Sequence, residues 1–545
     1  MSAVEMLSEI ERTSQAAPNR PLGIPTYCRP PNPLYAGEQK KPLPGYKRMP
    51  HTTFTVDAFS YGALDFCTGY FLTHFHSDHY GGLSKRFAGT IYCSQITANC
   101  ITSKLGLSSS QVHPLPMNTR CRVQDVLVTF IDANHCPGSV IILFEVPLEG
   151  GRVCRIVHTG DFRATTDQVL QILRVFGADA QTPLLPDDIC GSGLAAIPML
   201  LSPVVDYVYL DTTYLSPEHA FPEQDQVVEA VVEFCAKIQA EPPYLPNFIQ
   251  QAKGPARSGS AAQAKQAKKP ALLLTQWFRP LVSPKPRSTG YANRRRVLFV
   301  VGSYTIGKER LFIEIARRLE SKIFVSREKR RMLECIGSRS LLELVTDSMG
   351  EAQVHVVSMS AVNMRGMSEY LQVAQRAGGF SGVVAFSPTG WSHGGRSFPG
   401  SRPLPMAWPK VPDMAQTDQA AAEGDTRKLA SFLSQAAQMH STSRFAIEDL
   451  KPRGSSADIA IFPVPYSEHS SFAELARFVC SLKTGRVVPT VYSSVPDKNS
   501  GVLAWLRHWQ DLNSDFGRRL GDGGRAPPGD KHPTLGLYYH ATATE

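Results

Sequence analysis

Residues 70–83 read Tyr-Phe-Leu-Thr-His-Phe-His-Ser-Asp-His-Tyr-Gly-Gly-Leu, and this stretch decides the fold. The apolar residues at its start predict a short buried strand. Side chains alternate along an extended backbone, so His74 and His76 are expected on one face at the end of that strand. Two imidazoles on one face at a strand end are a candidate metal site.

The next residues add two more potential ligands. Ser77 predicts a helix N-cap, which directs Asp78 and His79 toward a neighbouring spot. The arrangement predicts two adjacent metal ions, one held mainly by imidazoles and one by carboxylate with imidazole. Such a ligand set suits zinc better than magnesium or calcium. The alternative is a surface histidine cluster without a metal.

Two further candidate ligands lie downstream, each after an expected strand. His135 sits in the turn Asp-Ala-Asn-His-Cys-Pro-Gly, where Pro and Gly favour a tight bend. Asp161 follows another strand, and a carboxylate there can bridge two cations. Taken alone, His135 is also explained as a turn residue and Asp161 as a helix cap. The expected ligands are His74, His76 and His135 on one ion, Asp78 and His79 on the other, and Asp161 shared.

Length and composition indicate a globular chain of several domains. Its 545 residues are 42% hydrophobic and 19% charged, which corresponds to about two to four domains. No apolar run reaches membrane-spanning length. The acidic first residues do not resemble a signal peptide, so the chain is expected to stay inside the cell. The 11 cysteines are scattered and without a Cys-x-x-Cys pair, which favours reduced thiols over a disulfide framework or a zinc finger.

The positive charge is concentrated in one segment. The net charge is +9, but residues 251–300 hold eleven Lys or Arg and no Asp or Glu, so the remainder is about −2 (9 − 11). Such a segment attracts nucleic acid non-specifically. A solvated linker explains it equally well.

The expected order of strands and helices is α/β, with biased segments between the folded parts. Residues 79–88 are expected to form a short helix, and residues 165–205 to be loop-like. The expected divisions are a disordered leader 1–50, a first domain 51–213, a second domain 214–393 with a basic low-complexity insertion 240–294, an insertion 394–457, a return to the first domain 458–510, and a loose tail 511–545.

The pattern His-x-His-x-Asp-His, followed by His135 and Asp161, resembles the metallo-β-lactamase superfamily. That resemblance implies an αβ/βα sandwich with metals at the strand ends. Asp211 in Tyr-Leu-Asp-Thr-Thr-Tyr and His469 in Tyr-Ser-Glu-His-Ser-Ser resemble the extra motifs of its nucleic-acid-processing β-CASP branch, an inserted α/β domain. Val491 falls where DNA-processing members carry valine and RNA-processing members carry histidine.

The motifs are most similar to those of the DNA cross-link repair nucleases of the nitrogen-mustard-sensitivity family. This implies that His469 completes the second metal site and that Asp211 orients it. Hydrolysis by a metal-activated hydroxide is then expected. Whether Asp78 or Asp161 accepts the proton stays open. The catalytic residues implied are Asp78, Asp161, Asp211 and His469, with Asp57 and Asp132 supporting the metal ligands from behind.

The turn Gly-Ser-Tyr-Thr-Ile-Gly-Lys at residues 302–308 joins an expected strand to a helix. It can offer backbone N–H groups, a hydroxyl and an ammonium to a 5′-phosphate, although it is not a P-loop. The alternative is a tight turn with an exposed lysine. The family resemblance adds the segment 388–391 and Ser467 to this pocket, and a surface position is expected for His393. The expected substrate-binding residues are Ser303, Tyr304, Lys308, Thr389 and Ser467.

The sequence thus predicts a metal-dependent 5′-to-3′ DNA exonuclease of DNA repair, acting chiefly on interstrand cross-links in the nucleus. Its expected cofactor is one or two Zn²⁺, with Mg²⁺ or Mn²⁺ as options at the second site. Expected partners are single- or double-stranded DNA with a 5′-phosphate, and repair proteins; no membrane contact is expected, and the oligomeric state is open. The alternatives are an RNA-processing endonuclease of the same branch, a small-molecule metallo-hydrolase, and a non-catalytic binding scaffold.

Overall fold

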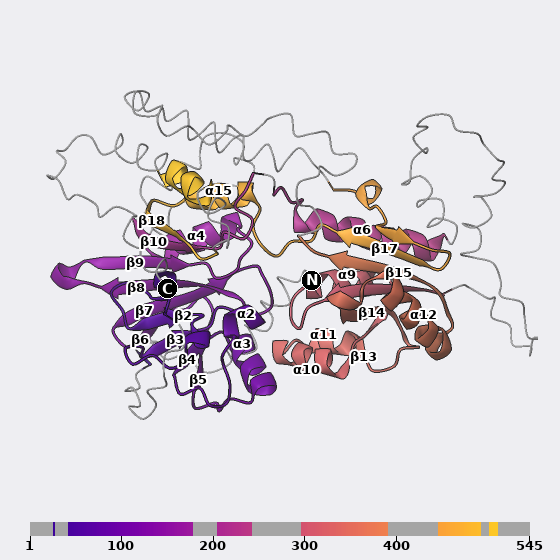
Figure 1. Ribbon diagram of the computed structural model, residues 1–545, viewed down its shortest axis with the longest axis horizontal. Helices are drawn as coiled ribbons and strands as arrows, with labels where there is room; N and C mark the ends of the chain where they lie inside the picture. The colour runs from indigo at the N-terminus through magenta and orange to yellow at the C-terminus, as the bar shows by residue number, and fades with distance from the viewer. Residues whose placement is uncertain are drawn as a thin grey trace, which may run out of the picture.

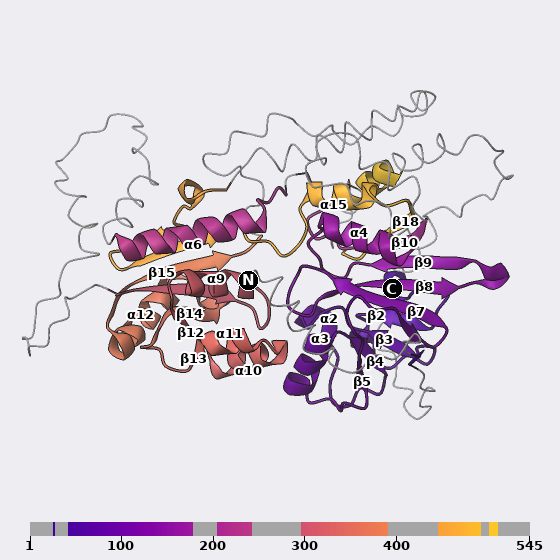
Figure 2. The same cartoon turned by 180° about the vertical axis from the view of Figure 1, so that it is seen from behind.

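The computed structural model describes residues 26–27, 42–177, 204–217, 219–241, 296–390, 445–491 and 501–510. These residues form two bodies that lie side by side, each with sheets inside and helices outside (Figure 1 and Figure 2). The first body holds the N-terminal part of the chain together with strand β18 (Thr484–Pro489) and helix α15 (Phe472–Cys480). The second body holds most of what lies between them in the sequence.

Two sheets form the centre of the first body. The larger has the order β1-β6-β7-β8-β9-β10-β18, and the smaller has the order β2-β3-β4-β5. The strands of the larger sheet are β1 (Thr26–Tyr27), β6 (Cys121–Val123), β7 (Val126–Asp132), β8 (Val140–Pro147), β9 (Val153–His158), β10 (Val205–Leu210) and β18 (Thr484–Pro489). Those of the smaller sheet are β2 (Phe54–Val56), β3 (Gly69–Phe71), β4 (Ile91–Cys93) and β5 (Val112–Pro114).

The two sheets pack face to face over an apolar core. Phe71 of the smaller sheet makes edge contacts with Phe130 and Phe144 of the larger sheet. Helices cover the outer face of each sheet. They are α2 (Ser77–Tyr80) and α3 (Gln95–Cys100) with the π-helical continuation Ile101–Leu105 on the side of the smaller sheet, and α4 (Thr166–Val175) and α15 (Phe472–Cys480) on the larger. This layering is the expected αβ/βα sandwich.

A single mostly parallel sheet, of order β13-β12-β14-β11-β15-β17-β16, forms the second body. Helices α6 and α9 pack in the core on one face, and α12 packs on the other. The strands are β11 (Arg296–Ser303), β12 (Lys322–Phe324), β13 (Val345–Thr346), β14 (Ala352–Ser358), β15 (Phe380–Pro388), β16 (Gly454–Ser455) and β17 (Ile459–Val464). The helices are α6 (Gln224–Ala240), α9 (Glu309–Arg318), α10 (Arg327–Ile336), α11 (Arg339–Leu344) and α12 (Met364–Gly378).

Short 3₁₀ turns complete the described elements. They are η1 (Gly45–Lys47), η2 (Phe59–Tyr61), η4 (Glu149–Gly151), η7 (Met359–Ala361) and η9 (Ile447–Asp449). Residues 501–510 are helical and pack Trp505 and Trp509 against Phe472 of α15.

The structure differs from several expected boundaries. Folded residues begin within the expected leader, since Met49 is buried and β1 pairs with β6. Strand β17 belongs to the second sheet, where it pairs with β15, so the return to the first body follows residue 464 rather than 458. An apolar strand of this kind fits the interior of either sheet, so sequence alone did not assign it.

The helices also differ from expectation in two places. Helix α4 occupies part of the segment 165–205 that was expected to be loop-like, because Thr165 and Gln168 form a capping box. Helix α2 ends at Tyr80, eight residues before the expected end at 88, because Gly81 and Gly82 follow it. The insertion 240–294, apart from residues 240 and 241, and the tail 511–545 lie outside the described residues. The expected insertion 394–457 extends too far, because residues 445–457 are folded: Phe445, Ile447 and Leu450 are buried in the core of the second body, and β16 pairs with β17.

Two further observations concern membrane-spanning helices and cysteines. The described helices include none with the length and apolar character that crossing a bilayer requires. The nine cysteines that the structure describes are free thiols, and all of them are buried.

Candidate metal centre

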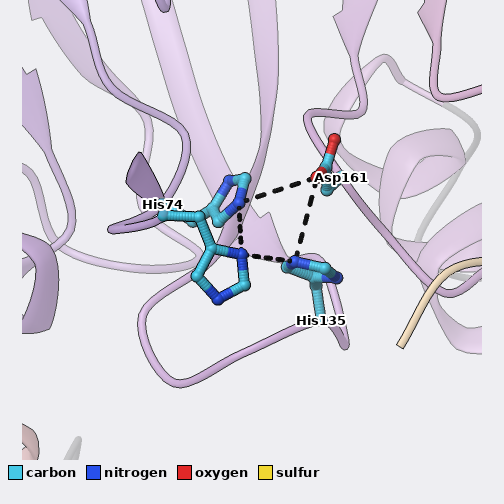
Figure 3. Close-up of side chains that lie close together, drawn as sticks. His74, His135 and Asp161 are labelled. Carbon is cyan, nitrogen blue, oxygen red and sulfur yellow. Dashed lines mark hydrogen bonds and ion pairs between the residues drawn. The ribbon is translucent and has the colours of Figure 1, made fainter. Parts of the chain in front are cut away.

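The candidate ligands come from parts of the first body that lie far apart in the sequence. His74 and His76 follow β3, and Asp78 and His79 lie on α2. His135 follows β7, and Asp161 follows β9. His469 lies between β17 and α15, more than 300 residues from the histidine-rich stretch. Figure 3 shows His74, His135 and Asp161 around a common centre.

These side chains form three overlapping groups whose ligand atoms lie within 4.8 Å of one another. Asp161 belongs to every group, as expected of a shared carboxylate. The groups are His74, His76, His135 and Asp161; then Asp78, His79 and Asp161; then Asp161, Asp211 and His469. All seven expected ligands are therefore brought together.

The first three histidines, here called the histidine trio (His74, His76 and His135), have a donor set that fits a cation. His76 Nδ1 lies 3.0 Å from His74 Nε2 and 3.1 Å from His135 Nε2. The opposite nitrogen of His76, Nε2, lies 3.0 Å from the carbonyl of Ile306, and that of His135, Nδ1, lies 2.8 Å from the carbonyl of Glu468. A carbonyl only accepts, so these outer nitrogens carry the protons and the inner ones carry lone pairs.

The same reasoning applies to His74 through its neighbour Thr73. The Thr73 hydroxyl donates to the Asp57 carboxylate at 2.7 Å, so it accepts from His74 Nδ1 at 3.0 Å. His74 Nε2 is then also a lone pair. Three lone pairs that face each other at about 3 Å cannot satisfy one another, whereas a cation among them can. The residues present therefore fit a bound metal ion.

The other two histidines, here called the carboxylate-backed pair (His79 and His469), are held differently. His79 Nδ1 donates to Asp57 at 2.7 Å, which leaves Nε2 3.2 Å from Asp161 and 3.7 Å from Asp78. His469 Nδ1 donates to Asp211 at 2.8 Å. Asp211 thus orients His469 as expected from the sequence.

The two arrangements have opposite electrostatic consequences. Burial lowers the pKa of all three trio imidazoles, and those of His74 and His135 lie well below the ordinary value. Burial acts in the same direction on His469, but the Asp211 carboxylate outweighs it and raises the pKa to about 9. For His79, Asp161 and Asp57 likewise outweigh burial and raise the pKa well above its ordinary value.

Asp57 connects both sets of histidines. It is 5% exposed, and its backbone takes the left-handed conformation at φ 51°. One oxygen accepts from the Thr73 N–H at 2.9 Å, and the other accepts from the Thr73 hydroxyl and from His79. Asp57 therefore orients His79 directly and His74 through Thr73, which is the supporting role expected of it.

Asp132 supports the site through the backbone. Its Oδ1 accepts from the Asn134 N–H at 2.8 Å, and Asn134 has a φ of 52°. This short turn holds the backbone from which His135 projects.

The expected substrate-binding residues divide by exposure. Tyr304 is 45% exposed, and its ring centroid lies 6.4 Å from that of His76. Ser303 and Ser467 are buried, and their hydroxyls bond to backbone carbonyls. Thr389 is partly exposed, and its N–H donates to the carbonyl of Val464.

Lys308 has a protein partner that sequence analysis did not identify. It is 4% exposed, and its ammonium lies 2.9 Å from the Glu468 carboxylate. The expected alternative of an exposed turn lysine is therefore wrong. The ammonium also donates to the carbonyl of Tyr466 at 3.2 Å.

Two other supporting residues were not identified from the sequence. Arg163 is 2% exposed and bonds to Glu474, to the carbonyl of Ser467 and to that of Pro222, so it ties the Asp161 segment to the His469 segment. Lys47, in the expected leader, donates to the backbone carbonyl of Asp57 at 2.7 Å. An arginine two residues after Asp161 was a visible signal, whereas nothing in the leader marked Lys47.

His158 is not part of any of the three ligand groups. His158 stacks on Tyr209 and accepts from the Gly160 N–H, so it is structural. Trp391 and His393 lie outside the described residues.

Comparison with known proteins found a family model and several relatives that resemble this chain in sequence. Residues 339–494 match the family model of the DNA repair metallo-beta-lactamase domain. The human DNA cross-link repair 1A protein is 33% identical over 474 residues, which cover 87% of this chain and 33% of that protein. The DNA cross-link repair protein PSO2/SNM1 of Saccharomyces cerevisiae is 30% identical over 501 residues, covering 86% of this chain and 67% of that protein. The 5′ exonuclease Apollo of Gallus gallus is 25% identical over 444 residues, covering 81% and 63%.

The chain spans about a third of the length of the cross-link repair 1A relatives and about two thirds of the yeast protein. The DNA repair metallo-beta-lactamase family implies metal binding, and the convergent His and Asp side chains fit a bound metal ion. The chain belongs to the metallo-β-lactamase family of DNA repair proteins that includes the PSO2/SNM1 cross-link repair proteins.

Proposed function

We propose that this chain is a metal-dependent 5′-to-3′ DNA exonuclease that acts in DNA repair, chiefly on interstrand cross-links. The observation that carries the proposal is the convergence of seven candidate ligands, three of which, the histidine trio, turn imidazole lone pairs toward one another. Two relatives named for cross-link repair and one named a 5′ exonuclease support the substrate and the polarity. These names also motivate a nuclear location and contacts with other repair proteins.

The proposed cofactor is zinc, in one or two ions. The histidine trio offers three neutral nitrogens and the Asp161 carboxylate, a donor set typical of zinc. The carboxylate-backed pair adds Asp78 and Asp161 oxygens, so Mg²⁺ or Mn²⁺ remains an option at this second position. When bound, such cations lower the pKa of a water and neutralise charge on a phosphodiester.

In this proposal the chain's own residues orient the ligands and manage the proton. Asp57 and Asp211 keep the Nδ1 protons of His79 and His469 pointing away from the centre. Asp161 is buried, and His79 beside it outweighs that burial and holds the pKa of its carboxyl well below the ordinary value. Asp161 therefore stays a carboxylate at neutral pH. Asp78 is largely exposed, with its side chain at 77%, and is the better placed of the two to pass a proton to solvent.

Substrate contact is proposed for the residues that keep exposed surface. The Tyr304 ring stands beside His76 and is a stacking platform for the terminal nucleotide. Thr389 is proposed to contact the 5′-phosphate. Ser303, Ser467 and Lys308 are buried and are proposed to support this pocket from beneath.

The function is tested with the purified chain and end-labelled single- and double-stranded DNA carrying either a 5′-phosphate or a 5′-hydroxyl. Mononucleotides released from the 5′ end, lost on chelation and restored by Zn²⁺, are the expected result. Faster cleavage of a matched RNA strand, internal cuts, or activity that survives chelation would refute the proposal.

The stacking role of Tyr304 has its own test. Tyr304→Ala is expected to raise KM for single-stranded DNA about tenfold, because stacking on an aromatic ring contributes about 1–3 kcal/mol per base. Tyr304→Phe is the matched control and should keep the wild-type KM. An unchanged KM in Tyr304→Ala would remove the residue from the substrate site.

A further inference from the structure

Two members of the histidine trio are oriented by backbone carbonyls that lie far from them in the sequence. The outer nitrogen of His76 lies 3.0 Å from the Ile306 carbonyl, which belongs to the turn between β11 and α9 of the second body. The outer nitrogen of His135 lies 2.8 Å from the Glu468 carbonyl, which lies between β17 and α15. Only His74 is oriented by a residue beside it in sequence, Thr73.

Glu468 joins these two outside contacts. Its backbone carbonyl accepts a hydrogen bond from His135, and its side-chain carboxylate bonds to Lys308, in the turn that carries Ile306. Oε1 accepts from the Lys308 N–H at 2.7 Å, and Oε2 lies 2.9 Å from the Lys308 ammonium. The Glu468 carboxylate thus binds both the backbone N–H and the side-chain ammonium of Lys308.

The backbone conformation of the turn lets the Glu468 carboxylate approach closely. Lys308 has a φ of 66°, an uncommon conformation for a residue with a side chain. A Cβ added at Gly307, whose φ is 112°, would lie 3.1 Å from the Glu468 carboxylate. Close approach of the carboxylate therefore depends on glycine at 307.

The Lys308–Glu468 pair is costly to break from one side. Lys308 is 4% exposed and Glu468 is 5% exposed, so removal of either charge leaves the other buried without its partner. A buried ion pair with this many satisfied hydrogen bonds favours one arrangement of the surrounding backbone. Here that arrangement sets the positions of the Ile306 and Glu468 carbonyls.

We propose that Glu468 and Lys308 are a positioning pair, which couples docking of the 304–308 turn to the orientation of His76 and His135. The histidine trio is then fully formed only when the second body is seated against the first. This inference rests on the metal dependence in the proposed function, and it assigns Lys308 to the metal centre rather than to direct contact with phosphate.

The test measures metal affinity in the absence of DNA. The variants Glu468→Gln, Lys308→Met and the double variant are compared with the wild-type chain by competition with a chromophoric zinc chelator. Each single substitution is expected to weaken metal binding by about 10–100-fold, the usual effect of losing a residue behind a ligand. The double variant is expected to be no weaker than the worse single variant, because both changes remove one interaction.

A spectroscopic measurement separates position from simple loss of stability. With Co²⁺ in place of zinc, the visible absorption reports the ligand geometry and should change in each single variant. Val301→Ala, in the core strand β11, is the matched control: it removes buried side-chain volume from the same body, and Val301 lies outside the 304–308 turn. Its metal affinity and cobalt spectrum are expected to match the wild type.

Three outcomes would overturn the positioning role. One is wild-type metal affinity in both folded single variants; a second is an equal loss of affinity in Val301→Ala. The third is a Lys308→Met variant with unchanged metal affinity that loses only its preference for 5′-phosphorylated DNA, which would return Lys308 to the substrate. A wild-type chain that binds zinc but does not cut DNA would refute the proposed function and leave this test intact.

Discussion

The histidine trio and the carboxylate-backed pair lie within one centre but are held in place by opposite kinds of partner. The outer nitrogens of the trio meet a hydroxyl and two backbone carbonyls. Those of His79 and His469 meet the carboxylates of Asp57 and Asp211. The trio imidazoles are kept neutral by burial, whereas the pair carries a raised pKa.

This difference shows that the protonation state of a buried histidine depends on the hydrogen-bond partner of its outer nitrogen as well as on burial. A carbonyl fixes the tautomer without adding charge, so the trio is ready for metal at neutral pH. A carboxylate fixes the tautomer and also raises the basicity of the ring. The trio is therefore the position that holds its ion without displacing a proton.

The largest expected effect comes from the one residue shared by both sets. Asp161→Asn keeps the shape of the side chain but removes the charge that both positions use. We expect a loss of at least about 1,000-fold in kcat, or about 4 kcal/mol, together with loss of bound metal. Metal analysis and single-turnover cleavage of end-labelled DNA measure both. Retention of the full metal content would mean that Asp161 is not shared.

Asp57 and Asp211 provide the sharpest comparison between the two sets. Asp57→Asn keeps a residue type that tolerates the left-handed backbone at this position. An amide has one acceptor oxygen where the carboxylate has two, so it cannot accept from the Thr73 N–H on one side and from the Thr73 hydroxyl and His79 on the other. Loss of the charge and of one acceptor therefore disturbs the support of both His74 and His79. Asp211→Asn disturbs His469 alone. We expect metal affinity to fall about 10–100-fold at both positions in Asp57→Asn, and at one position in Asp211→Asn.

Stepwise zinc titration of the two variants checks this difference. Thr73→Val is the matched control for the trio, because it removes the link to His74 and leaves the bond between Asp57 and His79 in place. Equal stoichiometry and affinity in Asp57→Asn and Asp211→Asn would break the distinction between trio and pair.

The smallest expected effect tests burial without a carboxylate. His355 in β14 is fully buried, and its partners are the Tyr370 hydroxyl and the carbonyls of Met349 and Ala352. Burial lowers its pKa to about 4, opposite to the shift of His469. Because the folded pKa lies below the unfolded value of about 6.5, stability is complete above that value and is lost as pH falls toward 4.

Between pH 7.5 and pH 5.5 this group should cost the wild-type chain about 1 kcal/mol of unfolding free energy. Denaturant titrations of wild type and His355→Gln at both pH values measure it, with the variant expected to show the shallower dependence. Parallel curves would mean that burial does not lower the pKa of His355.

Local sequence patterns predicted much of the first body and of its ligands. Alternation around His74 and His76, the turn at His135 and the strand end at Asp161 are all short-range features, and each residue lies where its pattern placed it. Helix α4 lies in a segment whose Pro and Gly residues predict a loop, but all of them follow Val175, so the capping box of Thr165 and Gln168 can begin a helix before them. Strand β17 was assigned to the wrong sheet because its apolar pattern does not depend on which neighbour it pairs with.

The sequence alone therefore determined which residue types carry the chemistry, because ligand identity, strand ends and turns are properties of neighbouring residues. The tertiary structure decided which nitrogen of each histidine faces the centre. It also decided that Lys308 is buried against Glu468 rather than exposed in a turn. These outcomes depend on acceptors that lie up to 333 residues away along the chain, and only folding brings such partners within hydrogen-bonding distance.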